Sequence, residues 1–429
     1  MGVKLIFTLS FFLLLLYPFI ASADTAPQVE WERNLGDNLA ETIYDIAQTS
    51  DGGYIGAGEK YSVNTFEDIY VVKLTASGEI EWEKKYMAAK EDYANSIKQT
   101  SDGGYIVCGG TYTDTEGVND FKIMKLDPAG GVEWEQKYGG NQRDVCEAII
   151  QTKDGGYMAA GDTWLNFYDR DIFLIKMDPN GNIEWDLNIG GGEEDGAYDI
   201  QQTSDYGYII AGYTRSVSDL SYAAYIVKTD PDGTVKWKSE FGGSGNDQFY
   251  SITQVDNGYV AAGYTESFNE FSDIYVVKVN LDGEKAWEKF YDGDETQDDA
   301  RSIKKTSDGG YILAGKTNEY SYGSYDMYLI KLNKEGDLQW SQVLGGENSD
   351  IGYSVLQSSD NGYVIAGQTK SLGGGGDAYI VKTEGSKTGT SGKTSSIIQD
   401  IPEYGSSANG ILISIFILVI TGLIMKRKL

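Results

Sequence analysis

The sequence contains no histidine, and it has only two cysteines, six prolines and six arginines among its 429 residues. The absence of histidine removes the commonest general base, the usual serine-hydrolase relay and every histidine-based metal site. Positive charge is scarce as well, because the formal net charge is −30. Such an acidic surface repels phosphate backbones, so we expect neither nucleic acid nor an anionic membrane surface as a partner. We interpret the acidity as an adaptation to a salty or crowded medium rather than as attraction to a cationic partner.

What the sequence does have is a repeat of about fifty residues that runs through most of the chain. Each copy carries a tryptophan, a turn of the Asp-Gly-Gly-Tyr type and an apolar run that ends in a lysine. Repeats of this length, with four short β segments per unit, are typical of propeller blades. The tryptophans are Trp31, Trp82, Trp134, Trp185, Trp237, Trp287 and Trp340; the turn tyrosines are Tyr54, Tyr105, Tyr157, Tyr208, Tyr259, Tyr311 and Tyr363; the lysines are Lys73, Lys125, Lys176, Lys228, Lys278, Lys331 and Lys382.

The third unit illustrates how one repeat forms a blade. Strands are predicted at 148–152, 157–161, 171–177 and 182–188, joined by turns that place glycine where φ must be positive. The third strand of each unit is apolar on both faces, so blades must cover it on both sides. We expect the tryptophans to be buried between blades, where each removes about 150–250 Å² from water and contributes roughly 4–6 kcal/mol before entropy.

The phase of the repeat predicts how the ring closes. The exported chain begins with a lone fourth strand around Trp31 and ends at Lys382 with a third strand that lacks its own fourth. Residues 28–34 should therefore complete the last blade, since both ends would otherwise expose unpaired strand edges. The sequence predicts an all-β fold: a seven-bladed β-propeller of four-stranded antiparallel blades over residues 28–383.

The sequence of both ends of the chain predicts export and attachment to the cell surface. Residues 1–23 have the basic start, apolar stretch and small residues of a secretory signal peptide. Residues 384–410 are rich in Ser, Gly and Thr and predict a flexible stalk. Residues 411–425 are apolar and precede a basic end at 426–429, which predicts either a C-terminal transmembrane helix or a sorting tail that is removed after export. We expect the propeller outside the plasma membrane, held at the cell surface.

The repeat units resemble those of exported Asp-Gly-Gly-Tyr repeat propellers of archaea and bacteria. The segment from Asp178 to Trp185 is also similar to the hairpin of quinoprotein-like propeller repeats, although its turn differs by one residue. Pro402, Glu403 and Tyr404 before the last apolar segment resemble archaeal surface-protein sorting tails. The first resemblance implies a cell-surface β-propeller whose ligand is generally unassigned, and it brings no catalytic residues.

A carboxylate stands at the start of every predicted inner strand. Either each acid accepts hydrogen bonds from the backbone of its own turn, or some of them bind Ca²⁺ weakly at the channel mouth. An acidic cluster at Asp292, Asp294, Glu295, Asp298 and Asp299 would help the second alternative. No other cofactor is predicted. The seven acids are Glu41, Asp92, Asp144, Asp195, Asp247, Asp298 and Asp350.

Two rims of the propeller differ in how much they vary. The first rim carries the turns between the first and second strands and between the third and fourth strands, and these turns have nearly the same sequence in every unit. The second rim carries the loops between the second and third strands and between blades, and these loops differ in sequence. Binding sites are expected on varied loops held by a rigid frame. On the second rim of blades 3 and 4, arginines lie beside aromatics, which suits a sugar ring, particularly an acidic one, or an aromatic anchor of a partner protein; the alternative is packing between loops. The predicted patch is Trp164, Phe167, Tyr168, Arg170, Arg143 and Arg215.

The cysteines and the absence of a catalytic motif complete the prediction. Cys108 and Cys146 stand where other copies have small residues, so we expect buried free thiols, with a disulfide between neighbouring blades as the alternative. We expect a non-enzymatic recognition, adhesion or structural module that binds a cell-surface glycan or protein. The alternative is an exported lyase, glycosidase or quinone-cofactor oxidoreductase. An acid pair with an arginine, found in one blade only and facing a pocket with perturbed pKa values, would favour an enzyme.

Overall fold

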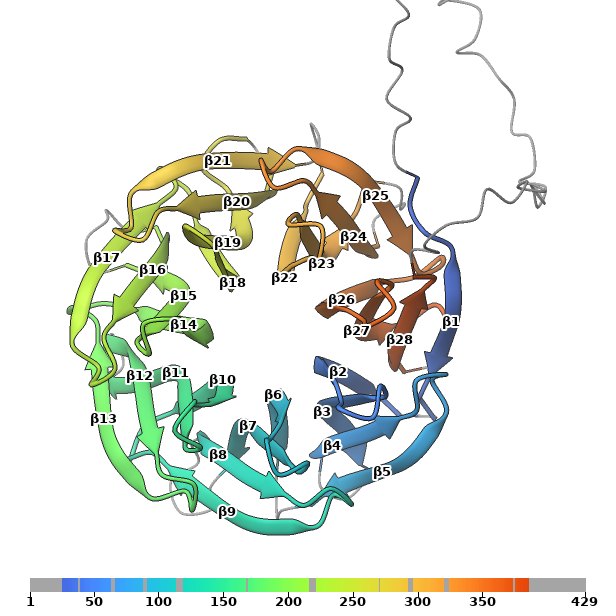
Figure 1. Ribbon diagram of the computed structural model, residues 1–429, viewed down its shortest axis with the longest axis horizontal. Helices are drawn as coiled ribbons and strands as arrows, with labels where there is room; N and C mark the ends of the chain where they lie inside the picture. The colour runs from blue at the N-terminus through green and yellow to red at the C-terminus, as the bar shows by residue number, and fades with distance from the viewer. Residues whose placement is uncertain are drawn as a thin grey trace, which may run out of the picture. The chain divides into compact units, whose positions relative to one another are not determined.

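The computed structural model describes residues 25–385, except 38, 63–65, 88–90, 113–118, 167–168, 216–220, 270, 292–295, 320–323 and 373–374. The described residues form a ring of seven four-stranded antiparallel sheets around a central channel (Figure 1). The predicted seven-bladed propeller is therefore confirmed. The predicted signal peptide, the C-terminal apolar segment and nearly all of the predicted stalk lie outside the described residues. Within the described part of the chain, no helix is long and apolar enough to cross a membrane.

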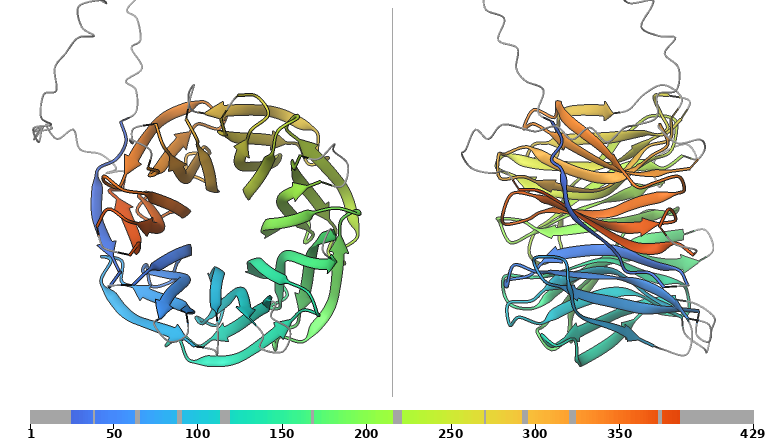
Figure 2. Two further views of the ribbon diagram at one scale, coloured as in Figure 1. Left: turned by 180° about the vertical axis from the view of Figure 1, so that it is seen from behind. Right: turned by 90° about the vertical axis from the view of Figure 1, so that its right-hand side faces the viewer.

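Each blade runs from an inner strand at the channel to an outer strand at the perimeter, and Figure 2 shows the ring from behind and edge-on. Blades 1–3 are β2(Glu41–Gln48), β3(Tyr54–Ser62), β4(Phe66–Leu74), β5(Ile80–Tyr86); β6(Asp92–Gln99), β7(Tyr105–Tyr112), β8(Asn119–Leu126), β9(Val132–Tyr138); and β10(Asp144–Gln151), β11(Tyr157–Asn166), β12(Asp169–Met177), β13(Ile183–Ile189). Blades 4–5 are β14(Asp195–Gln202), β15(Tyr208–Thr214), β16(Ala223–Thr229), β17(Val235–Phe241); and β18(Asp247–Val255), β19(Gly258–Thr265), β20(Asp273–Val279), β21(Lys285–Tyr291). Blades 6–7 are β22(Asp299–Lys305), β23(Tyr311–Thr317), β24(Asp326–Leu332), β25(Leu338–Leu344); and β26(Asp350–Gln357), β27(Tyr363–Thr369), β28(Asp377–Thr383), β1(Val29–Asn34).

The two ends of the propeller close the ring together. Strand β1 pairs antiparallel with β28, with Trp31 opposite Lys382 and Asn34 opposite Tyr379. Figure 1 shows this meeting of the first and last parts of the ring as a blue strand beside red ones. The predicted role of residues 28–34 is confirmed. Because β1 pairs with β28, the outer edge of β28 is not left as an open sheet edge.

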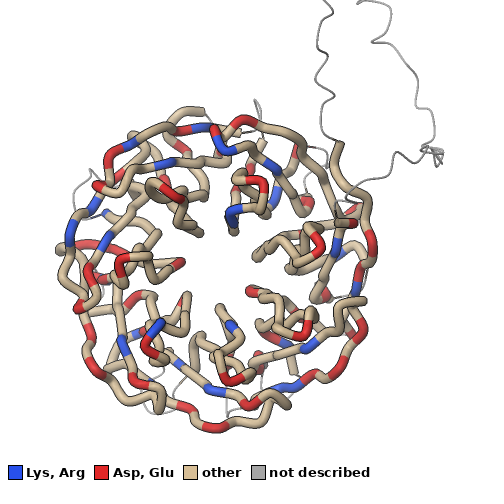
Figure 3. The backbone as a smooth tube through the Cα atoms, viewed as in Figure 1, with Lys and Arg blue, Asp and Glu red and all other residues tan. Residues whose placement is uncertain are grey.

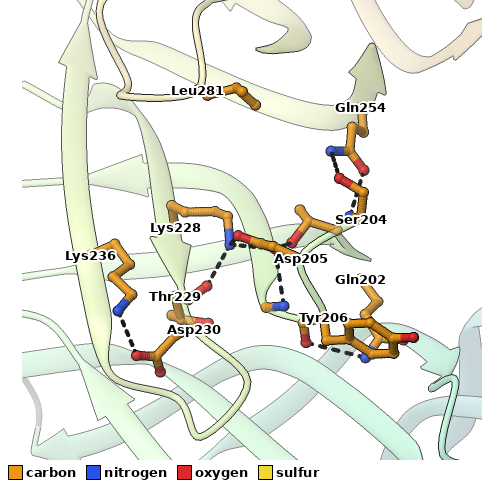
Figure 4. A network of polar contacts seen from close by, with 12 residues as sticks. Gln202, Ser204, Asp205, Tyr206, Lys228, Thr229, Asp230, Lys236, Gln254 and Leu281 are labelled. Atoms are coloured by element: carbon orange, nitrogen blue, oxygen red, sulfur yellow. Dashed lines mark hydrogen bonds and ion pairs between the residues drawn. The ribbon is translucent and has the colours of Figure 1, made fainter. Parts of the chain in front are cut away.

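The repeated Asp-Gly-Gly-Tyr turn and the repeated lysine are two halves of one contact. In blade 4, Lys228 is 4% exposed, and its ammonium group contacts Asp205 at 3.1 Å and the carbonyl of Thr229 at 2.6 Å (Figure 4). Asp205 also accepts a hydrogen bond from the backbone of Gly207 at 3.1 Å, which closes its own turn. One carboxylate thus satisfies the turn and neutralises a lysine that would be costly to bury alone. The same lysine–aspartate pair occurs at Lys73–Asp51, Lys125–Asp102, Lys176–Asp154, Lys331–Asp308 and Lys382–Asp360.

The tryptophans join neighbouring blades, but they are half-buried rather than fully buried. Trp237 of blade 4 contacts Tyr259 of blade 5, with ring centroids 6.1 Å apart, and donates a hydrogen bond from its indole nitrogen to the carbonyl of Leu281 at 2.9 Å. The ring covers Gly283, where φ is +83° and an added Cβ would lie 2.6 Å from the indole. A glycine stands five positions after each of the first six lysines, and at all six φ is positive and the tryptophan of the preceding blade lies against the place of a Cβ, so conformation and space both require glycine. Because the tryptophans lie on the outermost strands, part of each stays in contact with solvent.

Glutamines fix the inner strands to one another at the first rim. In six blades the glutamine near the end of the inner strand accepts a hydrogen bond from the turn backbone of the preceding blade, as Gln254 does from Ser204 at 3.1 Å (Figure 4). The seventh position is Lys305, which instead contacts Asp256 at 2.6 Å. The turn at Asp256 is the shortened one of blade 5, so the change of turn and the change of partner occur together. The six glutamines are Gln48, Gln99, Gln151, Gln202, Gln254 and Gln357.

Candidate functional site

Every inner strand contains a β-bulge at the same position. In β10 the register shifts between Cys146 and Ala148, so Glu147 has no partner residue on β11. A bulge re-aims a side chain, and bulges are common beside functional sites. The bulged residues of all seven blades line one cavity in the channel, and we call them the channel belt. The channel belt consists of Tyr44, Asn95, Glu147, Tyr198, Tyr250, Arg301 and Tyr353.

The channel belt is one of the positions of the inner strand at which the seven blades differ; the position directly after the initial acid also varies, as Thr42, Tyr93, Val145, Gly196, Gln248, Asp299 and Ile351. Four members are tyrosines and the others are an asparagine, a glutamate and an arginine. The cavity has a volume of about 260 Å³ and takes lining residues from all seven blades. Residues shared by all copies serve the architecture, so a cavity lined by residues that differ between copies is the best candidate for a specific site.

One side of the belt is aromatic and cationic. The guanidinium carbon of Arg301 lies 4.6 Å from the ring centroid of Tyr250 and 5.7 Å from that of Tyr353, a cation–π arrangement with both rings. Two nitrogens of Arg301 donate to the carboxylate of Asp299 at 3.1 and 3.0 Å. The ring of Tyr44 lies 5.0 Å from that of Tyr353. This side is therefore rigid, and its positive charge is balanced.

The opposite side of the belt is acidic, with Glu147 at its centre. The amide of Asn95 donates to Glu147 at 3.0 Å. Burial and, to a smaller extent, the nearby charge of Asp162 raise the pKa of Glu147 to about 8, against the opposing charges of Arg143 and Arg170. Burial likewise raises the pKa of Asp162 to about 6. Glu147 is therefore largely protonated at neutral pH and can donate as well as accept a hydrogen bond.

The carboxylates that directly follow two of the belt residues, Asp45 after Tyr44 and Asp199 after Tyr198, have a structural role. Asp45 accepts hydrogen bonds from the hydroxyls of Ser96 at 3.0 Å and Ser354 at 3.1 Å, and it also contacts Lys98. It thereby joins the inner strands of blades 7, 1 and 2. Asp199 does the same for blades 4 and 5, because it accepts from the hydroxyl of Ser251 at 2.9 Å. These acids connect neighbouring blades, and their carboxylates already accept hydrogen bonds from the adjacent inner strands.

The seven acids at the start of the inner strands are buried and do not line the channel cavity. Four accept a hydrogen bond from a backbone amide of their own turn: Asp144 from Gly140, Asp195 from Gly191, Asp247 from Gly243 and Asp350 from Gly346. Glu41 pairs with Lys60 at 2.9 Å, Asp92 pairs with Lys122 at 3.2 Å, and Asp298 accepts from Thr296. These contacts agree with the structural interpretation of the acids.

No arrangement of the described residues supports the calcium hypothesis. Among them, no group of three or more His, Cys, Asp or Glu side chains is placed to hold a metal ion. Asp299 pairs with Arg301 at 3.0 Å, and it also lies 3.5 Å from Lys316. Three members of the predicted cluster, Asp292, Asp294 and Glu295, lie outside the described residues, so weak Ca²⁺ binding stays a prediction.

The structure brings part of the predicted rim patch together. Arg170 lies between the rings of Trp164 and Tyr213, 5.3 and 5.2 Å from their centroids. Glu194 accepts from Arg170 at 3.1 Å and from Arg215 at 3.3 Å. These arginines therefore already have anionic and aromatic partners, as expected if the loops pack on each other.

Of the remaining patch residues, Arg143 adjoins this cluster, because its backbone carbonyl accepts a hydrogen bond from the backbone of Trp164 at 3.0 Å. Arg143 is exposed, and Phe167 and Tyr168 lie outside the described residues. The cluster does connect with the channel, because Tyr213 lies 5.5 Å from Tyr198 of the belt. Whether the patch binds a ligand stays a prediction.

The channel belt was missed from the sequence although a signal for it is present. Each belt residue follows the acid at the start of its inner strand by three positions, and that column reads Tyr, Asn, Glu, Tyr, Tyr, Arg, Tyr. The inner strand of the third unit was predicted to begin at residue 148, whereas β10 begins at Asp144. That error placed Glu147 outside the strand. The two cysteines are buried and free, and both lie in the core between blades 2 and 3, as the first interpretation predicts.

Comparisons with known proteins give the fold but no family. No family model matches the chain. The regulatory protein FlaEY of Caulobacter vibrioides is 23% identical over 400 residues, a match that covers 86% of this chain and 39% of that protein. The chain thus spans about two fifths of the length of this relative.

Similarity to solved structures is likewise at the level of architecture. Puromycin hydrolase matches with a TM-score of 0.50 and 11% identity over 80% of this chain and 52% of its own. A quinohemoprotein alcohol dehydrogenase of Pseudomonas putida HK5 matches with a TM-score of 0.41 and 10% identity over 89% of this chain and 80% of its own. The β-propeller domain of the trilobed protease of Pyrococcus furiosus matches with a TM-score of 0.47 and 9% identity over 80% of this chain and 96% of its own. The Asp-Gly-Gly-Tyr family stays a resemblance.

Proposed function

We propose that this protein is an exported, cell-surface recognition module that binds a small ligand in the central cavity, at the channel belt. The observation that carries the proposal is the break in symmetry: a sevenfold frame presents seven residues of four different types to one cavity. Ligand sites are concave, pre-formed and lined by aromatic side chains with a few convergent polar groups. The belt has this composition. Export and surface attachment rest on the sequence of the two ends of the chain.

The experiment compares two sites in one screen. The full chain is screened against a glycan array and a small-molecule library, beside an Asn95→Ala variant of the belt and a Trp164→Ala variant of the rim patch. A ligand that is lost with Asn95→Ala and kept with Trp164→Ala supports the channel site. The reverse pattern would instead locate binding at the rim patch and overturn the proposal.

One observation favours the enzyme alternative enough to keep it. Glu147 and Asp162 are two carboxyls of blade 3 with raised pKa values, and Arg170 lies 3.5 Å from Asp162. This is the single-blade acid pair with an arginine that would favour catalysis. However, only Glu147 lines the cavity, and Asp162 is 6% exposed. A second carboxyl that does not reach the ligand cannot act as its base or nucleophile, so we favour recognition.

A turnover assay distinguishes recognition from catalysis. A ligand found in the screen is incubated with the wild-type chain and with Glu147→Gln, and product is followed by mass spectrometry. Recognition predicts that the ligand is recovered unchanged from both. Product that forms with the wild type and not with Glu147→Gln would establish the enzyme alternative.

A further inference from the structure

The charged groups of the channel cavity balance each other, although the protein as a whole is strongly acidic. Acidic residues are spread around the whole ring (Figure 3), and the net charge of the chain is −30. The cavity, in contrast, is lined by equal numbers of acids and bases, and the nearest pairs are already in contact. Because Glu147 is largely protonated at neutral pH, the charged acids are Asp45 and Asp199 of the lining and Asp299, which pairs with Arg301; the bases are Lys98, Arg301 and Lys304.

This balance disfavours an ionic ligand. Arg301 is paired with Asp299, and Lys98 is paired with Asp45. At Arg301 or Lys98 a charged ligand would have to displace one of these partners, which is costly; the other charged lining groups, Lys304 and Asp199, form no ion pair within the described part of the chain. An uncharged ligand can bind without breaking either of these two ion pairs. The electrostatics of the cavity therefore select against net charge.

The belt still offers several open hydrogen-bonding groups. Within the described part of the chain, the hydroxyls of Tyr250 and Tyr353 make no hydrogen bond, and neither is sealed from solvent. Asn95 uses its amide nitrogen for Glu147 and Cys146, which leaves its side-chain carbonyl as an acceptor. The second carboxyl oxygen of Glu147 also faces no donor among the described residues. The site thus presents hydroxyl, carbonyl and carboxyl groups beside aromatic rings.

The size of the cavity limits the ligand to a single ring. Pockets for drug-sized molecules have volumes of about 300–1,000 Å³, and this cavity has about 260 Å³. A compound that is compact, uncharged, rich in hydroxyls and apolar on its C–H faces matches both the polar groups and the aromatic faces.

We propose that the ligand of the channel belt is one uncharged sugar ring, either free or as the terminal residue of a glycan, held by the hydroxyls of Tyr250 and Tyr353 and by Asn95 and Glu147. This inference rests on the proposed function and specifies its ligand class. The aromatic rings of Tyr250 and Tyr353 lie against the C–H faces of the sugar. Arg301, fixed between the two tyrosines, holds them in place and contributes no free charge.

The test titrates the full chain by isothermal calorimetry with neutral hexoses (D-glucose, D-galactose and D-mannose), with the charged analogues D-glucuronate and D-glucosamine, and with oligosaccharides that end in the neutral hexoses. The variant is Tyr250→Phe with Tyr353→Phe, which removes two hydroxyls and keeps both rings. The matched control is Tyr379→Phe, because Tyr379 donates its hydroxyl to Glu32 on the outer strand, away from the channel.

We expect a neutral hexose to bind the wild type, with roughly tenfold weaker binding in the double variant and no change in the control. Tighter binding of the oligosaccharide than of the free hexose identifies a glycan terminus, and the opposite order identifies a free sugar. If glucuronate or glucosamine binds more tightly than every neutral hexose and responds to the double variant, the ligand class is wrong while recognition in the channel stands. If no sugar binds, the inference is overturned, and the broader screen still decides the proposed function.

Discussion

The carboxyl of Glu147 should make the stability of the propeller depend on pH in a direction that is unusual for an acid. In the unfolded chain this group loses its proton near its ordinary pKa of 4.5, whereas burial in the folded protein raises the pKa to about 8. Between these values the folded state binds more protons than the unfolded state. Raising the pH therefore destabilises the folded state, starting above pH 4.5 and levelling off above pH 8.

The magnitude follows from the pKa difference and from the position of the side chain. Each pKa unit corresponds to about 1.4 kcal/mol, so the full shift would lower the free energy of unfolding by roughly 4–5 kcal/mol. Glu147 lines the cavity and is not completely buried, so water in the cavity screens part of this effect. We expect about 2 kcal/mol between pH 5 and pH 8.

Glu147→Gln removes this titration and keeps the shape of the side chain. The free energy of unfolding is measured by urea denaturation of wild type and variant at pH 5 and pH 8. Relative to wild type, the variant should become about 2 kcal/mol more stable as the pH rises. Glu284→Gln, at an exposed glutamate, is the control and should show no such change. A constant difference between wild type and Glu147→Gln at both pH values would refute the reasoning, because Asp162 and the neighbouring arginines are common to both proteins.

Three further predictions concern the frame, all measured as free energies of unfolding. Asp205→Ala leaves Lys228 buried with only a carbonyl as partner, and we expect a loss of about 3 kcal/mol. Lys305→Ala removes a partly exposed pair with Asp256 and should cost no more than about 1 kcal/mol; a larger loss would mean that this contact fixes the two blades. Trp237→Ala should cost about 2 kcal/mol, less than for a fully buried tryptophan; a loss near zero would show that the tryptophans do not join the blades.

The sequence was sufficient to predict the frame because the frame is repeated. Seven copies of Trp, Asp-Gly-Gly-Tyr and Lys gave the number of blades, and the phase of the repeat gave the pairing of β1 with β28. The partners of individual residues were not predictable in the same way. That Asp205 contacts Lys228, 23 positions away, follows from the register of β15 and β16, which the pattern of apolar residues does not specify.

The candidate site was predicted less well because variation was sought only in loops. Loops usually carry function, and the rim patch followed from that general expectation. The channel belt lies within strands, where a bulge removes one residue from the ladder in each blade. Periodicity does not reveal a bulge of one residue, because the residues on both sides keep their own alternation. A column-by-column alignment of the seven copies places the belt among the variable positions of the inner strand, and the bulge then distinguishes it from the others.

The bulge itself explains why the belt is free to vary. The residue before each bulged position packs in the core between blades: Ile43, Ala94, Cys146, Ala197, Phe249, Ala300 and Gly352 are all buried. The residue after it is confined as well, as Asp45 and Ser96 show by bonding across blade boundaries. The bulged residue has neither a cross-strand partner nor a place in the core. A change there alters the cavity and leaves the frame intact, so relatives of this propeller should keep the turn aspartate, lysine and tryptophan of each blade and differ mainly in the belt.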